Sequence, residues 1–293
     1  MKNFRFLAML LLGVLLNVNL ISCSKDDNLP EKGDDKVEHP NGIPNKIPNN
    51  VIYYTTKDNI IVRLKNEDVF GGAKIVSNTY SSTKGYGTIE FASEVTAIES
   101  KAFMKQSTLT YIAFSNSVTS IGNSAFEYCS GLTSVQISDI TAWCNIDFGD
   151  CFSNPLSYAH HLYMKGKEVK DLVIPKSVTS IGGAAFYKCS GLTSVTIPNS
   201  VTSIGNAAFL NCAGLTSVTI GNSVKSIGNS AFEYCSELLD VYCYAENVPS
   251  TGSNAFYGSY PEYATLHVPA ASIDSYKASA PWRWFGKIVA LTK

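Results

Sequence analysis

The chain is poor in charge, and the charge that it has is balanced. Only 16% of its 293 residues are Asp, Glu, Lys or Arg, and the formal net charge is −1. Proteins that bind nucleic acid gather Lys and Arg into a basic patch or stripe, and the sequence offers no run from which to build one. We therefore expect no nucleic-acid partner.

The sequence also lacks the familiar signatures of catalysis and metal binding. It contains no glycine-rich phosphate loop, no metal-binding helix motif and no nucleophile elbow. Catalysis needs a few unlike groups in one pocket, whereas this chain repeats rows of like groups. Its four histidines, His39, His160, His161 and His267, have no obvious partners in the sequence. We expect neither an enzyme nor a bound cofactor.

Long apolar runs are missing except near the start. The run from Phe6 to Leu16 follows two basic residues, and it is shorter than the about 20 residues that a membrane-spanning helix needs. This arrangement is typical of a secretory signal. The next stretch, LISC from Leu20 to Cys23, resembles the lipobox of bacterial lipoproteins. The resemblance implies a signal peptide over residues 1–22 and a lipid anchor on Cys23. The alternative is an ordinary cysteine just past a signal.

The segment after Cys23 is polar. SKDDN (Ser24 to Asn28) resembles the acidic signals that export Bacteroidetes lipoproteins. That resemblance implies a lipid-anchored protein of the outer membrane, exposed at the cell surface. A solvated charge run is the alternative. Residues 24–50 are rich in Pro, Asn, Asp and Lys and cannot bury enough apolar surface to fold. We predict a lipidated flexible tether over residues 23–50.

The rest of the chain repeats one phrase. VTSIGNSAFEYCSGLTSVQI, residues 118–137, returns with small changes from Val178, Val201 and Val224. An Ala-Phe pair marks each unit, and its phenylalanines are spaced by 23, 60, 23, 23 and 24 residues. The spacing of 60 contains one enlarged unit, at about residues 138–174, with an insertion of 14 residues. The chain therefore has about seven units of period 23, and several such units must stack to bury a common core.

Each repeat unit contains sequence signals for two short strands and a turn. LTSVTI (Leu192 to Ile197) has the apolar spacing of a short strand, and VTSIG favours a second short strand that ends at glycine. NAAFLNC has room for one helical or 3₁₀ turn that points Phe209 inward. Four cysteines share one position of the repeat, namely Cys129, Cys189, Cys212 and Cys235. That position favours a column of small buried side chains over a disulfide framework.

The period, the SVTSIG-xx-AF-xx-C phrase and the strand spacing resemble the BspA-like leucine-rich repeats of bacterial surface proteins. The resemblance implies a strand-dominated α/β fold, a right-handed solenoid with a parallel strand ladder. It also implies cell-surface adhesion and binding to a host or matrix protein. We place the solenoid at residues 92–259, between a β cap at 51–91 and a C-terminal cap at 260–293.

Short signals suggest how the two caps are built. Val51 to Leu64 alternates around Lys57-Asp58-Asn59 and predicts a β-hairpin, with Gly87 to Phe91 as a further strand. Near the other end, Thr265 to Pro269 predicts a last strand before a short helix around Ile273 to Lys277. Solenoids need such atypical end units to cover their core.

Residues between the inward positions of the ladder strands should form an outward face. The alternation predicts that this face could bind a ligand through hydroxyls, carboxylates and end tyrosines. Its candidate residues are Tyr111, Ser134, Gln136, Asp171, Ser194, Thr196, Ser217, Thr219, Asp240 and Tyr242. At any single position the alternative is an ordinary strand residue that faces water. An ice-binding threonine ladder from Thr133, Thr193 and Thr216 ranks far below, because the array is irregular.

The enlarged unit and the C-terminus supply the aromatic candidates. Trp143, Trp282 and Trp284 could contact a glycan, although covering the core is the alternative for each. Cys144 and Cys151 could form a disulfide in an oxidising compartment. With the adjacent histidines they match no standard zinc spacing, so we expect no metal site.

The sequence leaves two functions open. The first is an adhesin that binds a host or matrix protein through the ladder face. The second is a glycan-binding surface lipoprotein of a polysaccharide-uptake system, which would use the insertion and the terminal aromatics.

Overall fold

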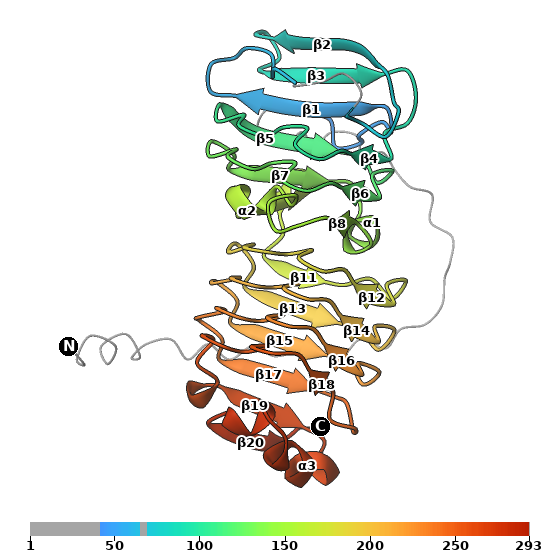
Figure 1. The fold of residues 1–293 in the computed structure, drawn as a ribbon. Coiled ribbons are helices and arrows are strands. Elements are labelled where there is room, and N and C mark those ends of the chain that lie inside the picture. The colour runs from blue at the N-terminus through green and yellow to red at the C-terminus, as the bar shows by residue number, and fades with distance from the viewer. Residues whose placement is uncertain (1–41, 65–68, 293) are drawn as a thin grey trace, which may run out of the picture. The chain divides into compact units, whose positions relative to one another are not determined.

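A computed structural model describes residues 42–64 and 69–292 of the chain. All of these belong to one compact unit, Val37–Lys293. The expected signal peptide, Cys23 and most of the expected tether lie outside the described residues. Within that unit, strands dominate, most sheets are parallel and the helices are short, as in a leucine-rich-repeat fold (Figure 1).

One side of the repeat is a six-stranded parallel sheet. In spatial order its strands are β11 (Asp171–Val173), β13 (Ser194–Ile197), β15 (Ser217–Ile220), β17 (Asp240–Cys243), β19 (Thr265–Val268) and β20 (Lys287–Ala290). Ser194 pairs with Ser217, and Ser217 pairs with Asp240, so partners lie 23 residues apart. The alternation buries Val195 and Ile197 and turns the residues between them outward, because side chains on a strand alternate between its faces.

A second side is built from two-residue strands. β12 (Ser180–Ile181), β14 (Ser203–Ile204), β16 (Ser226–Ile227) and β18 (Ser250–Thr251) form a four-stranded sheet. Earlier layers form a three-stranded sheet from β4 (Ala97–Ile98), β6 (Ser120–Ile121) and β8 (Asp147–Phe148). The expected second strand is therefore present. Its isoleucine is buried in five of these seven strands, whereas β8 has Phe148 and β18 has Thr251, both partly buried.

The third side is the Ala-Phe segment, where we expected a helical or 3₁₀ turn. No helix forms there, because the residues two before and two after the phenylalanine have left-handed backbone; in one layer they are Ala207 (φ 55°) and Asn211 (φ 60°). Left-handed residues interrupt a helix. Single turns remain, such as the one in which Leu210 N donates to Ala207 O at 3.1 Å, and Phe209 is buried as expected. Alternate N–H groups instead point to the next layer: Phe186 N donates to Ala208 O at 2.7 Å, and Phe209 N to Ala231 O at 2.8 Å.

Phenylalanine and cysteine columns fill the core. Phe186, Phe209, Phe232 and Phe256 are stacked with ring centroids 5.1 to 5.5 Å apart. The cysteine position is buried as expected, and its thiol also forms a hydrogen bond. The Cys212 thiol donates to the carbonyl of Phe186 at 3.1 Å. In the last layer Ser259 occupies this position and donates to the carbonyl of Phe232.

Polar side chains support the same stacking. The Thr216 hydroxyl donates to the carbonyl of Thr193 at 3.0 Å, and Thr133 bonds Thr110 in the same way. Asparagine carbonyls accept N–H groups of the next layer, as Asn206 does from Asn229 at 2.8 Å. These threonines are therefore structural, with their hydroxyls directed along the stack.

The N-terminal cap differs from the expected hairpin. A seven-stranded sheet, which we call the first sheet, runs in the order β10 (Lys167–Glu168), β9 (Leu162–Met164), β7 (Ser134–Ile137), β5 (Leu109–Phe114), β1 (Val51–Thr56), β3 (Tyr86–Phe91) and β2 (Ile75–Ser81). β1 pairs antiparallel with β3 and β5. Residues 60–64 form no strand, so the hairpin around Asp58 is wrong.

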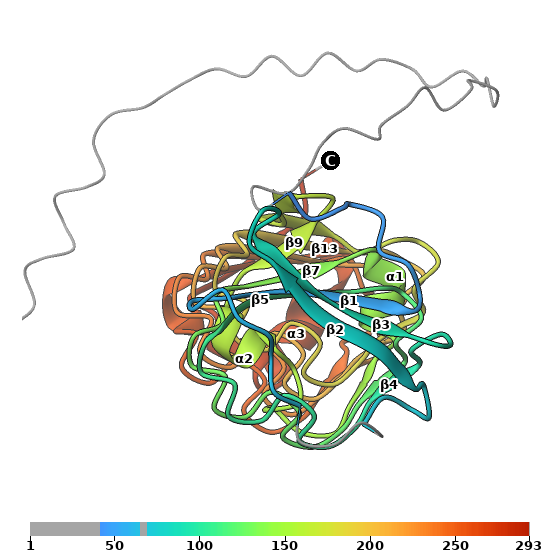
Figure 2. The ribbon, with the colours of Figure 1, turned by 90° about the horizontal axis from the view of Figure 1, so that it is seen from above.

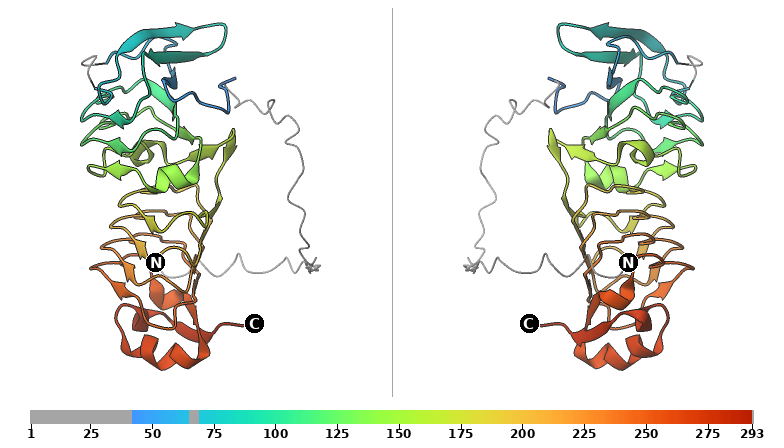
Figure 3. Two further views of the ribbon diagram at one scale, coloured as in Figure 1. Left: turned by 90° about the vertical axis from the view of Figure 1, so that its right-hand side faces the viewer. Right: turned by 90° about the vertical axis from the view of Figure 1, so that its left-hand side faces the viewer.

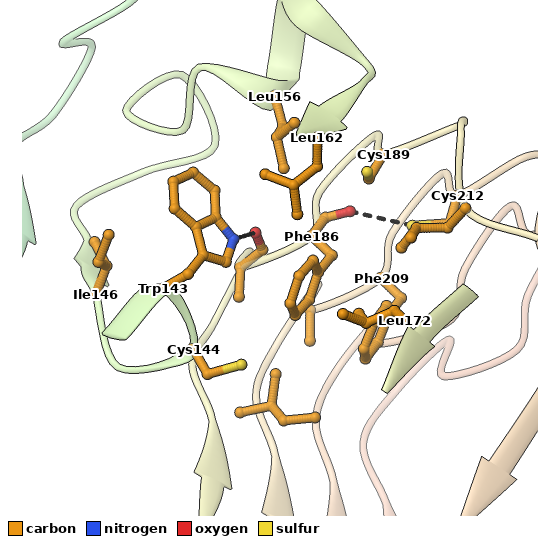
Figure 4. Close-up of a cluster of buried hydrophobic side chains, with 14 of the residues drawn as sticks. Trp143, Cys144, Ile146, Leu156, Leu162, Leu172, Phe186, Cys189, Phe209 and Cys212 are labelled. Atoms are coloured by element: carbon orange, nitrogen blue, oxygen red, sulfur yellow. Dashed lines mark hydrogen bonds between the residues drawn. The ribbon is translucent and has the colours of Figure 1, made fainter. Parts of the chain in front are cut away.

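The enlarged unit interrupts the ladder and supplies replacement hydrogen bonds. Its helix α1 (Ile140–Cys144) is capped by Asp139, whose carboxylate accepts from Ala142 N at 2.7 Å. The Trp143 indole donates to the carbonyl of Ala185 at 2.8 Å (Figure 4). Asn154, just before α2 (Leu156–Ala159), donates to that same carbonyl at 3.0 Å. The hairpin of β9 and β10 then ends the first sheet.

The C-terminal cap contains one strand more than expected. The segments η1 (Pro261–Tyr263), η2 (Ala270–Ser272), α3 (Ile273–Ala278) and η3 (Trp282–Trp284) lead to β20, so Thr265–Val268 is not the last strand. Trp282 and Phe285 pack on Phe256, and the Trp282 indole donates to the carbonyl of Pro249 at 3.2 Å. Figure 2 looks down the stack of layers from its N-terminal end.

The glycines of the second side give a test of layer packing. A Cβ at Gly205 would lie 2.6 Å from the main-chain nitrogen of Gly183, whereas a Cβ at Gly183 would find its nearest neighbour at 3.4 Å. We predict that Gly205→Ala lowers the free energy of unfolding by about 2 kcal/mol or more, because the layers must move apart. Gly183→Ala should be neutral or slightly stabilising. Urea unfolding of both variants checks this, and equal losses would contradict the packing.

Candidate binding surfaces

The open surface is the outward face of the six-stranded sheet, which we call the ladder face. It presents two rows, one residue of each row from every strand. The first row is Asp171, Ser194, Ser217, Asp240, Thr265 and Lys287, and the second is Val173, Thr196, Thr219, Tyr242, His267 and Val289. None of these side chains is buried. Seven of the ten predicted ligand-binding residues therefore lie together here, from Asp171 to Tyr242.

Hydrogen bonds fix the polar side chains at both ends of the ladder face. Asp171 Oδ1 accepts from the hydroxyls of Ser194 at 2.7 Å and Thr193 at 3.0 Å. These bonds hold the pKa of Asp171 below its usual value, so its charge persists. At the other end His267 Nε2 lies 2.8 Å from Asp240 Oδ1, and its ring stacks on Tyr242 at 4.2 Å. The sequence did not single out His267, although its register position could have done so.

The outward face of the first sheet is covered, which corrects the predictions for Tyr111, Gln136 and the flexible tether. Residues 42–48, which we call the strap, lie beside the first sheet (Figure 3). Ile43 and Ile47 of the strap pack with Tyr111, which is 1% exposed. Gln136 is 0% exposed, and Ser134 is partly buried. Tyr111 and Gln136 are therefore no part of an open surface, and the predicted flexible tether does not extend to residue 50.

For two of the three tryptophans the alternative holds: they cover the core and are no glycan contacts. Trp143 (1% exposed) stacks on Phe114 inside the core, and Trp282 (0%) packs on Phe256, the last ring of the phenylalanine column. Trp284 is 55% exposed.

A cluster of exposed aromatic residues, which we call the aromatic flank, was not predicted as a group. Its members are Tyr234, Tyr257, Tyr260, Tyr263 and Trp284. Tyr234 and Tyr257 meet edge to face at 5.8 Å, and Tyr234 N donates to Tyr257 O. Gly286 N donates to Pro261 O, so the segments that carry Tyr263 and Trp284 lie side by side. A rising density of tyrosine after residue 230 was the available signal.

Three further properties of the described residues concern metal binding, membrane crossing and the contacts of the two adjacent histidines. No group of three or more His, Cys, Asp or Glu side chains in residues 42–64 and 69–292 could hold a metal ion. The same residues contain no helix of the length and hydropathy that a bilayer crossing requires. His161 pairs with Glu168 at 2.6 Å. Burial lowers the pKa of His160, whose ring lies 3.1 Å from the carbonyl of Lys188.

Comparison with known proteins gives one strong match and several weaker ones. A family model described as "BspA type Leucine rich repeat region" matches in six copies, over residues 45–155 and 158–278. Among curated protein sequences, none matches the chain.

Solved structures of bacterial leucine-rich-repeat proteins are similar to parts of the chain. The T. pallidum leucine-rich-repeat protein is 27% identical, with a TM-score of 0.39 over 64% of this chain and 78% of that one. The pneumococcal vaccine antigen PcpA is 20% identical, with a TM-score of 0.41 over 68% and 58%. A leucine-rich-repeat protein of Bacteroides ovatus is 17% identical, with a TM-score of 0.32 over 68% and 65%. The family rests on the repeat match, because none of these TM-scores reaches 0.5.

The cysteines give a second test. All seven described cysteines are free, and only Cys151 is partly exposed. Burial raises the pKa of Cys129, Cys144, Cys189 and Cys235 to about 12, and thiols react as thiolates. We predict that iodoacetamide at pH 8 modifies Cys151 in the folded protein and the others only after unfolding. Peptide mass spectrometry checks this. A Cys144–Cys151 disulfide, or labelling of Cys212 before unfolding, would contradict it.

Proposed function

The chain belongs to the BspA-type leucine-rich-repeat family, and from that membership we propose that it is a cell-surface adhesion protein that binds a host or matrix protein. The ladder face is the binding surface in this proposal. The protein is held in the outer membrane by a lipid on Cys23, exposed at the cell surface, and carries out no catalysis. Its open parallel ladder is the observation that supports this most directly, since repeat proteins generally bind partners on such extended surfaces.

The ladder face has the physical properties of a protein-binding surface. Its backbone is fixed by hydrogen bonds to both neighbouring layers, so little order is lost when a partner binds. Val173 and Val289 give exposed apolar contacts at the two ends. Between them lie hydroxyls, two carboxylates and the stacked pair of Tyr242 and His267. Such a mixed surface suits an interface with an apolar core and a polar rim.

Two lysines on the ladder face should weaken this binding. We predict that Thr196→Lys/Thr219→Lys weakens binding to its matrix protein about tenfold or more, because two long charged chains would stand at the centre of the contact. The matched control is Thr179→Lys/Thr202→Lys, which adds the same charge 23 residues apart on the second side. An array of host matrix proteins identifies the partner, and surface plasmon resonance measures both variants. Equal binding by both would sink the ladder face as the site.

A second function is favoured by the aromatic flank. We propose as the alternative a glycan-binding surface lipoprotein of a polysaccharide-uptake system. Five exposed aromatic side chains over neighbouring segments offer flat apolar faces on which the C–H faces of sugar rings can pack. Their tyrosine hydroxyls can bond sugar hydroxyls at the same time. The sites of the two functions differ, so mutation separates them.

The glycan function predicts a loss of binding from changes in the aromatic flank alone. Tyr263→Ala and Trp284→Ala should each reduce binding on a glycan array about tenfold or more, since each removes one exposed aromatic surface. Tyr128→Ala is the control, because Tyr128 is exposed to the same extent as Trp284 and lies in the second Ala-Phe unit, outside the aromatic flank. If the wild-type protein binds no glycan on the array, this function is excluded for the sugars tested.

A further inference from the structure

The strap rests on the first sheet in the manner of a bound peptide. It forms neither helix nor strand and bends at Asn45 and Lys46. Its two isoleucines, Ile43 and Ile47, are four residues apart and both buried. They pack on outward side chains of three neighbouring strands, namely Tyr53 of β1, Tyr86 of β3, and Tyr111 and Ala113 of β5.

The strap is held by side chains rather than by its main chain. In the described part of the chain, no hydrogen bond joins residues 42–47 to the sheet. Main-chain attachment begins at the last residue of the strap, where Val51 N of β1 donates to Pro48 O at 3.1 Å. It continues just after the strap, where Val95 N donates to Asn49 O at 2.9 Å and Phe91 N to Asn50 O at 3.0 Å. The strap can therefore lift away from the sheet about residues 49 and 50 without breaking the ladder.

Polar groups near the strap remain unsatisfied. Gln136 is fully buried, and among the described residues neither its amide oxygen nor its amide nitrogen has a hydrogen-bond partner. Its neighbours in register are Ala113 on β5 and Tyr163 on β9. Asn45 Oδ1 of the strap is also buried, with no hydrogen-bond partner in the part of the chain that the structure describes. Unpaired buried polar groups weaken the closed state. A primary amide pairs naturally with the N–H and C=O groups of an extended main chain.

From these observations we propose that the outward face of the first sheet is a second binding site, for an extended polypeptide with two aliphatic side chains four residues apart. The strap occupies the site and keeps it closed. A partner segment displaces the strap by offering the same aliphatic contacts and main-chain groups that pair with Gln136. This site lies on a different sheet from the ladder face, so it stands or falls independently of the function proposed above.

The experiment opens the strap in the full-length chain. Ile43→Asp/Ile47→Asp places two carboxylates where apolar contacts are now, and Ile60→Asp/Ile61→Asp, at exposed positions, is the matched control. The first readout is tryptic cleavage after Lys46, which lies between the two buried isoleucines and follows the open fraction of the strap. The second is binding of a fluorescent peptide with the strap sequence GIPNKIPNN, residues 42–50.

We expect slow cleavage and no peptide binding for the wild type and the control. The opened variant should be cleaved rapidly and should bind the peptide saturably. A peptide with serine at both isoleucine positions should bind at least about tenfold more weakly, because two aliphatic contacts are lost. Ile47→Ala is the milder second variant if the double variant does not fold, and it should show faster cleavage and measurable binding.

Two outcomes would overturn the proposal. Rapid cleavage after Lys46 in the folded wild type would mean that the strap does not keep the face closed. An opened variant that remains folded, is cleaved rapidly and still binds no peptide would mean that the face under the strap is no binding site.

Discussion

The structure depends on main-chain hydrogen bonds between successive layers. Each layer is bonded to the next on three sides: through the long ladder strands, through the two-residue strands and through the Ala-Phe segment. On the third side the bonds exist only because residues such as Ala207 and Asn211 adopt left-handed backbone, which costs a non-glycine residue about 1–2 kcal/mol. Three bonded sides at one spacing require layers of equal length. This requirement explains why the sequence repeats so closely.

The enlarged unit shows how the stack tolerates a break. Residues Ser124, Phe126 and Tyr128 would donate to a regular next layer, and the insertion replaces two of the three acceptors by side chains. Ser124 N donates to the Asp150 carboxylate, Tyr128 N to the Tyr158 hydroxyl, and Phe126 N still finds a carbonyl, that of Phe152. Toward the following repeat, the Trp143 indole and the Asn154 amide both donate to the carbonyl of Ala185. Where a side of the stack is interrupted, its buried main-chain N–H and C=O groups still need hydrogen-bond partners. Here side chains of the insertion supply them.

The contrast between regular layers and irregular segments explains what could be predicted from the sequence. The strands, the buried isoleucines and the phenylalanine and cysteine columns follow from period and alternation, because each is set by contacts with identical neighbours. The left-handed turns could not be predicted, since Ala, Lys, Asn, Ser and Tyr all occupy them. Alternation correctly turned Tyr111 and Gln136 outward from the core. It could not show that Ile43 and Ile47, two apolar residues in a polar segment, cover that face. Such contacts between distant, non-repeating segments leave no periodic trace.

The contrast between regular and irregular parts also limits where the ladder face can be specific for a ligand. The middle of the ladder face, Ser194 to Thr219, repeats the same small hydroxyl residues in adjacent layers, so a ligand shifted by one layer would meet nearly the same groups. A register is defined only where the rows change. One end has Asp171 and Val173; the other has Asp240, Tyr242 and His267, held by a hydrogen bond and a ring stack. A partner that spans several layers can be positioned by these two unlike ends while the regular rows between them supply contact area. The repeated part of the chain thus builds the surface, and its exceptions give that surface a direction.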